Sequence, residues 1–331
     1  MIPVGQPYRA TGPIEIQPVL ITIILGIVTG IFGAGLVWLW ESSPIPTLMI
    51  LTPIIQGIIV GSAFGFMVGR LQMRNPRLVG TIAFACGLLS IGLVHFGHHL
   101  QLTTEIASQM RHDVESDPEL PAQQKQRILK QLDTAPEAAA DRFLVMRTGS
   151  SGLLGSMKFR NEIGVHLKRT LVTGTVLWGL WVVEALIVAT TAWGLAAKAA
   201  GKPYCEDCGY WCLHQPDVLV LPVDQGQLLL SALREDNSEL ARSAIDQSST
   251  DEGTGHVGVS LHACPNCDLC FADVSQRAPH GKSEMKVTQL AQLLRISPEM
   301  VGTLTNPRTD AAHATAEPEP PQEEATLQPE A

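Results

Sequence analysis

Six of the seven cysteines fall in two short clusters after residue 200. The first cluster reads Cys205-Glu-Asp-Cys208-Gly-Tyr-Trp-Cys212-Leu-His214, and the second reads His262-Ala-Cys264-Pro-Asn-Cys267-Asp-Leu-Cys270. Two cysteines separated by two residues present both thiolates to one ion on a tight turn, at sulfur–metal distances of about 2.3 Å. Two such pairs complete a tetrahedral site. We therefore predict that Cys205, Cys208, Cys264 and Cys267 hold one structural zinc ion.

Three further residues of these clusters, Cys212, His214 and Cys270, stand outside the set of four. They could serve as alternative metal ligands, as buried thiols, as part of an iron–sulfur site or as a redox pair. The seventh cysteine, Cys86, lies inside a long apolar segment, where cysteine behaves as a small apolar residue.

The sequence Cys264-Pro-Asn-Cys267-Asp resembles the knuckles of zinc-ribbon and rubredoxin-like proteins. The resemblance covers the two knuckles only, and it implies a fold type rather than an activity. The 55 residues between Cys208 and Cys264 exceed the usual gap of a compact ribbon. We expect this insertion to hold a strand over 217–223 and a helix that Asp224 caps and that continues toward Ile245, followed by a polar loop over 248–255. A strand over 256–262 leads into the second knuckle.

Four long apolar segments precede the cysteine clusters, at about 18–40, 47–69, 78–100 and 171–197. A helix needs about 20 apolar residues to cross a bilayer, and none of these segments has a polar face. We therefore predict a four-span α-helical transmembrane bundle with a small α+β zinc-ribbon-like cytosolic domain. The predicted parts are an N-terminal cytosolic segment 1–17, three spans within 18–100, an extracytoplasmic helical loop 101–170, a fourth span 171–197, the zinc domain 198–305 and a disordered acidic tail 306–331.

The distribution of basic residues near the span ends predicts the orientation. Arg70, Arg74 and Arg77 lie between the second and third spans, whereas 41–46 contains no base. This pattern predicts a multi-pass protein of the cell membrane with both termini in the cytoplasm. The basic residues of 158–169 oppose this assignment, but long loops are translocated largely regardless of charge. Thiolate metal sites persist in a reducing cytosol, which agrees with the same orientation.

The second span carries glycines at intervals of four residues: Gly57, Gly61, Gly65 and Gly69. Such a stripe lets another helix approach closely. It predicts either tight packing within one bundle, or a homo-oligomeric interface or pore lining.

Two polar side chains lie deep in the predicted spans, Glu184 in the fourth and Gln56 in the second. Intramembrane carboxyl groups are costly and often functional. Glu184 either joins two helices as a neutral hydrogen-bonded carboxyl, with Gln56 as its best partner by depth, or belongs to a transport path.

Four histidines fall on the predicted outer side: His95, His98, His99 and His166. Because imidazole binds zinc, copper and iron, these residues are candidates for a metal or haem site, although histidine is also tolerated at the membrane boundary.

The remaining patterns exclude several classes of function. The net charge of −9 disfavours nucleic-acid binding. Residues 287–304 have the apolar spacing of a helix-turn-helix, but 298–304 contain no base, so we expect ordinary helical packing there. No nucleotide-binding, hydrolase or metalloprotease motif occurs, and we predict no enzyme. We expect the zinc domain to bind a protein partner or support assembly; a transporter or channel using Glu184, or a membrane-anchored redox or metal sensor, are the alternatives.

Overall fold

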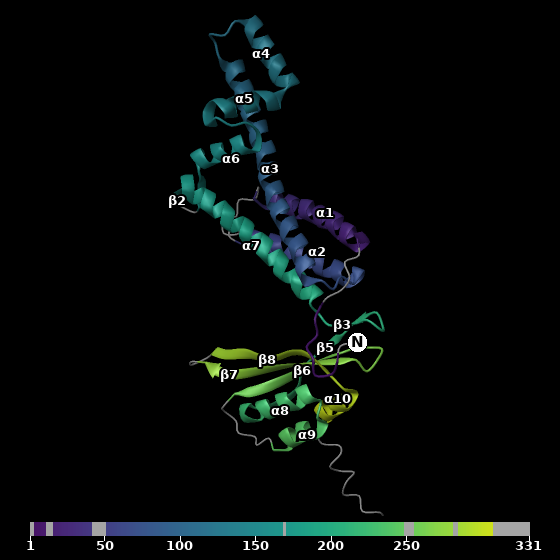
Figure 1. The fold of residues 1–331 in the computed structure, drawn as a ribbon. Helices are drawn as coiled ribbons and strands as arrows, with labels where there is room; N and C mark the ends of the chain where they lie inside the picture. The colour runs from purple at the N-terminus through teal and green to yellow at the C-terminus, as the bar shows by residue number, and fades with distance from the viewer. Residues whose placement is uncertain are drawn as a thin grey trace, which may run out of the picture. The chain divides into compact units, whose positions relative to one another are not determined.

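The computed structural model describes residues 3–10, 16–41, 51–167, 170–247, 255–280 and 284–306. The chain divides into two compact units, one formed by residues 10–201 and the other by residues 1–9 together with 202–331 (Figure 1). The first residues of the predicted second span, the polar loop over 248–254 and the acidic tail beyond residue 306 lie outside the described residues.

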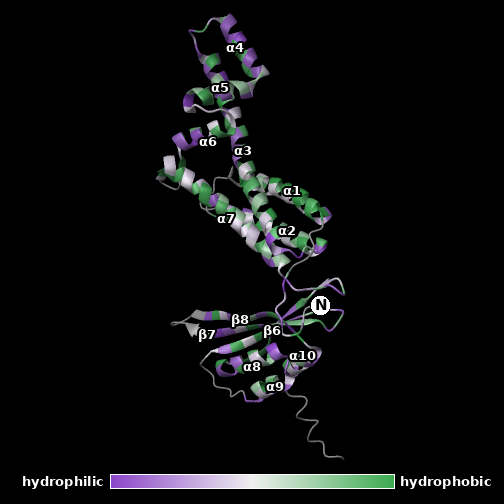
Figure 2. Ribbon diagram, viewed as in Figure 1, coloured by the Kyte–Doolittle hydropathy of each residue, from purple (hydrophilic) through white to green (hydrophobic). Residues whose placement is uncertain are grey.

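The described residues of the first unit form seven helices and one short hairpin. In chain order they are α1 (Ile16–Glu41), α2 (Thr52–Leu71), α3 (Pro76–Ser116), α4 (Ala122–Thr134), α5 (Pro136–Thr148), α6 (Gly152–Ile163), β1 (Val165–Leu167), β2 (Thr170–Val172) and α7 (Gly174–Ala200). Helices α1, α2, α3 and α7 are long and apolar enough to cross a membrane, in agreement with the four predicted spans. Many large apolar side chains of these helices are exposed, among them Leu20, Phe66 and Val182. Figure 2 shows that the ribbons of these helices are coloured largely as hydrophobic.

The four apolar helices pack into one bundle. Helix α7 lies along both α2 and α3, and α1 packs on α3 and α2. Small residues allow the close approach, since a Cβ atom on Gly26 of α1 would lie 2.6 Å from the Phe64 ring of α2 and 2.8 Å from Cys86 Sγ of α3. Cys86 is buried here.

Helix α3 continues far beyond the segment predicted to span the membrane. Its 41 residues extend about 60 Å, twice the thickness of the hydrocarbon core. The polar half of α3 packs against α4, α5 and α6 around an apolar cluster that contains Ile106, Ala140 and Leu144. The predicted loop is therefore a small helical domain, and its breaks fall at the prolines that the sequence supplies.

The second unit contains a four-stranded antiparallel sheet with helices on one face. Its elements are β3 (Tyr204–Cys205), β4 (Tyr210–Trp211), β5 (Leu213–Pro222), α8 (Val223–Glu235), α9 (Ser238–Asp246), β6 (His256–Ala263), β7 (Cys270–His280), β8 (Glu284–Ile296) and α10 (Pro298–Thr305). The sheet order is β5-β6-β7-β8, and β3 pairs with β4 in a separate hairpin. The main core lies between the sheet and α8, α9 and α10, and includes Leu229, Leu233, Val257 and Met300.

Three local predictions change in this unit, while the strand predicted over 256–262 is confirmed as β6. Asp224 does not cap α8, because the helix begins at Val223 and Pro222 stands at its N-cap. The single helix predicted here is in fact two helices, α8 and α9. Asp236, with φ +52°, ends the first, and Asn237 caps α9 by accepting a hydrogen bond from the Leu240 amide. Residues 287–296 form part of strand β8 rather than a helix, and only 298–305 are helical.

Candidate metal centre

The first CxxC pair lies on a tight hairpin. Strands β3 and β4 pair antiparallel, with Cys205 opposite Tyr210. The Gly209 amide donates to the Cys205 carbonyl at 2.9 Å, and Gly209 has φ +75°, a conformation that residues with a side chain rarely adopt. The Tyr204 and Trp211 rings meet edge to face across the hairpin. The backbone therefore folds both thiols toward one side of the turn.

The second CxxC pair occupies the turn between two long strands of the sheet. Strand β6 ends at Ala263, which pairs with Cys270 at the start of β7. The Cys264 amide donates to the Leu269 carbonyl at 2.8 Å and closes the turn. Cys264 is buried, and Cys267 is exposed at the tip of the loop.

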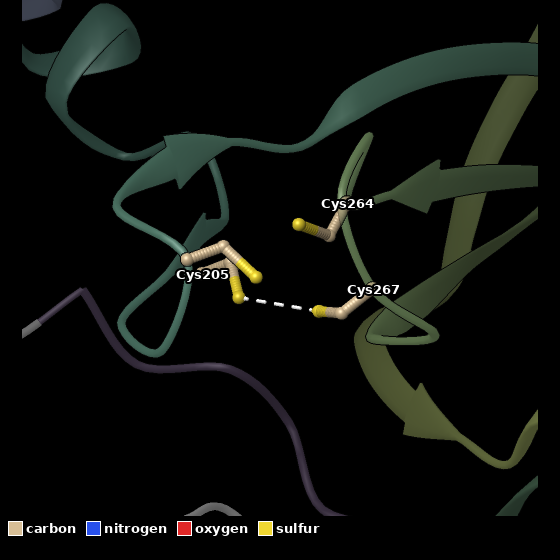
Figure 3. A group of neighbouring side chains, drawn as sticks. Cys205, Cys264 and Cys267 are labelled. Carbon is tan, nitrogen blue, oxygen red and sulfur yellow. Dashed lines mark hydrogen bonds between the residues drawn. The ribbon is translucent and has the colours of Figure 1, made fainter.

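The two turns face each other and bring four thiols together (Figure 3). The Sγ atoms of Cys205, Cys208, Cys264 and Cys267 all lie within 4.8 Å of one another, and those of Cys205 and Cys267 are 3.5 Å apart. A tetrahedral zinc site with bonds of about 2.3 Å places its sulfur atoms about 3.8 Å apart. The arrangement therefore fits a metal ion, and this group of four could hold one.

The thiols influence the pKa values of one another. Burial raises the pKa of Cys205, and the pKa of Cys208 is raised chiefly by its interaction with the Cys267 thiol and then by desolvation. At Cys264 burial also acts to raise the pKa, but hydrogen bonds from the Asn266 amide and from neighbouring thiols outweigh it and lower the pKa. A cation bound among the four sulfurs would favour the thiolate at every one of them.

The other cysteines of the two clusters lie outside this group. Burial raises the pKa of Cys212 to about 12 and that of Cys270 to about 11, so both thiols are protonated at neutral pH. The thiolate is the reactive form of cysteine, and the redox-pair alternative for Cys212 and Cys270 stays a prediction. The His214 ring stacks on that of His262 across β5 and β6, with centroids 4.5 Å apart. Within the described residues, the four predicted cysteines are the only group of three or more candidate ligands close enough together to hold a metal ion.

The residues around the metal centre form a second, smaller apolar cluster. Its buried members are Cys205, Cys212, Cys264, Phe271 and Leu293, and Tyr8 packs against it. Asp273 supports this cluster by accepting a hydrogen bond from the Leu293 amide and by contacting His262 Nε2 at 3.1 Å. Tyr8 and Asp273 were not identified from the sequence, because nothing in their local pattern indicates a contact with residues so distant in the chain.

A buried polar network joins three helices of the apolar bundle. Gln56 Nε2 of α2 donates to Ser90 Oγ of α3 at 2.6 Å, and Ser90 Oγ donates to the Gly30 carbonyl of α1 at 3.0 Å. Gln56 Oε1 is buried and has no hydrogen-bond partner among the residues that the structure describes. Gln56 thus has a hydrogen-bond partner, Ser90, that the sequence did not indicate. Glu184 lies in α7 with a partly buried side chain.

The glycine stripe of α2 faces α7 in the same chain. A Cβ atom on Gly57 would lie 2.8 Å from Thr191 Cβ, and one on Gly61 would lie 2.9 Å from Leu195 Cβ. A Cβ on Gly65 would make an ordinary contact with α7, and one on Gly69 would meet nothing within 4 Å. The first two glycines therefore allow the closest packing between α2 and α7.

The histidines of the predicted outer side have separate surroundings. The His95 ring meets the Trp181 ring edge-on at 5.4 Å, and His99 Nδ1 lies 2.6 Å from Ser156 Oγ on α6. His98 is partly exposed on α3. His166 belongs to β1, and its side chain lies outside the described residues. A metal or haem site at these residues stays a prediction.

No protein-family model, curated protein or solved structure matches the chain. The features that define the protein are therefore its own. They are four apolar helices, a helical domain formed by the polar half of α3 with α4 to α6, and an α+β domain with a four-cysteine site.

Proposed function

We propose that this chain is a multi-pass membrane protein whose second unit is a structural zinc domain on the cytosolic side, serving protein interaction or assembly. The observation that carries this proposal is the convergence of four thiols from two turns. Four thiolates fill a tetrahedral zinc ion and leave no position for water or substrate. The zinc would stabilise the domain rather than catalyse a reaction, and we propose no enzymatic activity.

The cytosolic location rests on three supporting features. Residues 3–9 belong to the same unit as 202–306, which favours placing both on one side of a membrane. The turn before α3 carries Arg70, Arg74 and Arg77, as cytoplasmic turns do. A site of free thiols requires a reducing compartment.

The sheet supplies a surface for a partner. Helices α8, α9 and α10 cover one face, and within the described part of this unit no helix covers the other. The uncovered face includes Ser260, Ser275 and the Asp217–Arg277 ion pair, and Val220, on the edge strand β5, is 51% exposed there. Such a mixed surface, with apolar and polar groups side by side, suits a protein partner.

Metal analysis of the full-length protein in detergent, purified under reducing conditions, tests the zinc site. We expect one zinc per chain, retained in Cys212→Ser and in the control variant Cys86→Ser, and lost in Cys264→Ser. Iron instead of zinc, or zinc retained by Cys264→Ser, would refute the assignment. Loss of zinc in Cys212→Ser would show that Cys212 is a ligand in place of one of the four assigned cysteines.

Two experiments in membranes test the location and the partner. Protease cleavage sites inserted at residue 120 and in the segment 307–331 should differ in accessibility. Protease added to intact cells should cleave the first site, whereas the second should be cleaved only after lysis. A photocrosslinking residue at Val220 should capture a protein other than a second copy of this chain, and one at Ser231 on the exposed side of α8 should not. Equal capture at both positions, or none at Val220, would contradict the interaction role.

The buried polar network favours one second candidate, a proton pathway through the bundle that uses Glu184. Gln56 Oε1 without a partner and an intramembrane carboxyl group are features of such paths. Proteoliposomes containing a pH-sensitive dye would show proton flux under an imposed potential, reduced in Glu184→Gln and unchanged in Glu105→Gln. Absence of flux in the unmodified protein would exclude this function.

A further inference from the structure

The N-terminal segment of the chain adds a short strand to the edge of the sheet in the second unit. The Gly5 amide donates to the Arg295 carbonyl at 2.8 Å, and the Tyr8 amide donates to the Leu293 carbonyl at 2.8 Å. Between them, the Arg295 amide donates to the Gln6 carbonyl at 3.0 Å. These residues cover part of β8, the edge strand of the sheet.

The same segment reaches the apolar cluster that holds the metal ligands. The Tyr8 ring meets the Phe271 ring edge to face, with centroids 5.3 Å apart. That cluster contains Cys205 and Cys264, and Tyr8 packs against it. Figure 3 shows the N-terminal segment, in purple, passing beside the turn that carries Cys205.

Glycine is required at one point of this contact. Gly5 has φ +77°, and a Cβ atom there would collide with the carbonyl oxygen of Arg234 at the end of α8. Any larger residue would therefore both strain the backbone and push the segment away from the domain. The docked position is a specific fit rather than a loose association.

The metal cluster and the main core are separate sets of residues. The main core between the sheet and α8, α9 and α10 contains none of the four ligands, whereas Cys205 and Cys264 are buried in the small cluster, against which Cys208 and Tyr8 pack. Loss of a metal would remove the sulfur–metal bonds between the two cysteine turns and leave them joined by weaker contacts, such as the pairing of Leu213 with Ala263. The surface on which Tyr8 packs would then loosen, while the main core would keep its own contacts.

We propose that metal binding at the four cysteines locks the N-terminal segment onto β8, an inference that rests on the proposed zinc centre. The segment continues through residues 10–15 into α1, and α7 continues through 201–203 into β3. With metal bound, the domain is thus linked to the apolar bundle through both the docked N-terminal segment and residues 201–203. Without metal, it is linked through residues 201–203 alone. Because binding free energies are reciprocal, docking of the segment must also strengthen metal binding.

Hydrogen exchange on the full-length protein in detergent and reductant tests the proposal, with zinc and after chelation. We expect chelation to speed exchange at the Gly5 and Tyr8 amides at least tenfold, while the amides of α8 around Leu229 keep their protection. Unchanged exchange at Gly5 and Tyr8 would overturn the proposal. Equal loss of protection in α8 would overturn it too, because it would show global unfolding rather than release of the segment.

The reciprocal measurement uses zinc affinity, determined by competition with a chelator. Tyr8→Ala and Gly5→Val should weaken zinc binding about tenfold, and Gln6→Ala, whose side chain is exposed and whose backbone makes the contact, should not. Equal affinity in all four proteins would overturn the coupling. A full-length protein that binds no zinc would refute the proposed function and this inference together, whereas zinc binding without coupling would refute the inference alone.

Discussion

Alanine substitutions along the glycine stripe test how α2 packs on α7. A Cβ atom on Gly61 would lie 2.9 Å from Leu195 Cβ and 3.0 Å from the Cα of Ala192, whereas one on Gly65 would lie 3.6 Å from its nearest neighbour. Carbon atoms in contact prefer separations of at least about 3.5 Å, so Gly61→Ala requires α7 to move back by about 0.6 Å.

The magnitude follows from comparing the two variants. Alanine gains about 0.5–1 kcal/mol over glycine in a helix, and this gain is common to both positions and cancels. Overpacking costs about 1–3 kcal/mol and applies to Gly61 alone. We therefore expect Gly61→Ala to be less stable than Gly65→Ala by about 1–3 kcal/mol, a factor of about 5 to 150 in the unfolding equilibrium.

Unfolding of the detergent-solubilised protein by SDS, followed by tryptophan fluorescence, measures this difference. Light scattering on the same samples gives the oligomeric state, which should be identical in both variants because the contact lies within one chain. Equal stabilities would refute the packing argument. Dissociation of an oligomer by Gly61→Ala alone would instead place the stripe between two copies.

Three further predictions concern the buried network, the metal and the main core. Ser90→Ala removes the acceptor of Gln56 Nε2 and should cost about 1–3 kcal/mol in the same SDS assay; an unchanged stability would contradict it. The raised pKa values of Cys205 and Cys208 keep both thiols protonated at neutral pH, whereas zinc binds only thiolates. Zinc must therefore displace at least these two protons, so its affinity should rise at least about 100-fold per pH unit between about pH 6 and 7.5. Chelator competition that shows a shallower slope would contradict the two-proton exchange. Leu233→Ala should destabilise the second unit by about 2–5 kcal/mol in chemical denaturation, and a loss below about 1 kcal/mol would show that this side chain is not in the main core.

The features that the sequence predicted well depend on local signals. The four apolar helices follow from length and hydropathy, and the end of α3, both ends of α4 and the start of α5 follow from prolines at 118, 121 and 136. The extension of α3 beyond the predicted span follows from the lack of glycine and proline over 101–116. The four cysteines of the metal centre were found because the spacing of a CxxC turn is itself the geometric requirement.

Strand β8 shows how an irregularity can imitate another structure. A regular strand alternates buried and exposed residues, but the pairing of β7 with β8 shifts register on both sides of Val274. As a result Leu293 and Leu294 are both buried although they are adjacent, and Leu293 has φ +48°. The apolar spacing therefore deviates from a period of two, and it was mistaken for that of packed helices.

The docked N-terminal segment could not be predicted from its own residues, since it contains Pro3, Gly5 and Pro7, which are rare in strands. The register explains how β8 accepts it. Pro7 lies opposite Leu294 at a position where the ladder uses the amides and carbonyls of the flanking residues, so its missing N–H costs no hydrogen bond. Because Pro7 has no N–H to donate on its other side, it allows pairing with β8 alone. It therefore suits a segment at the edge of a sheet and prevents a further strand from joining beyond it. The composition that argues against a strand in isolation thus matches an edge strand whose partner lies almost 290 residues away in the chain.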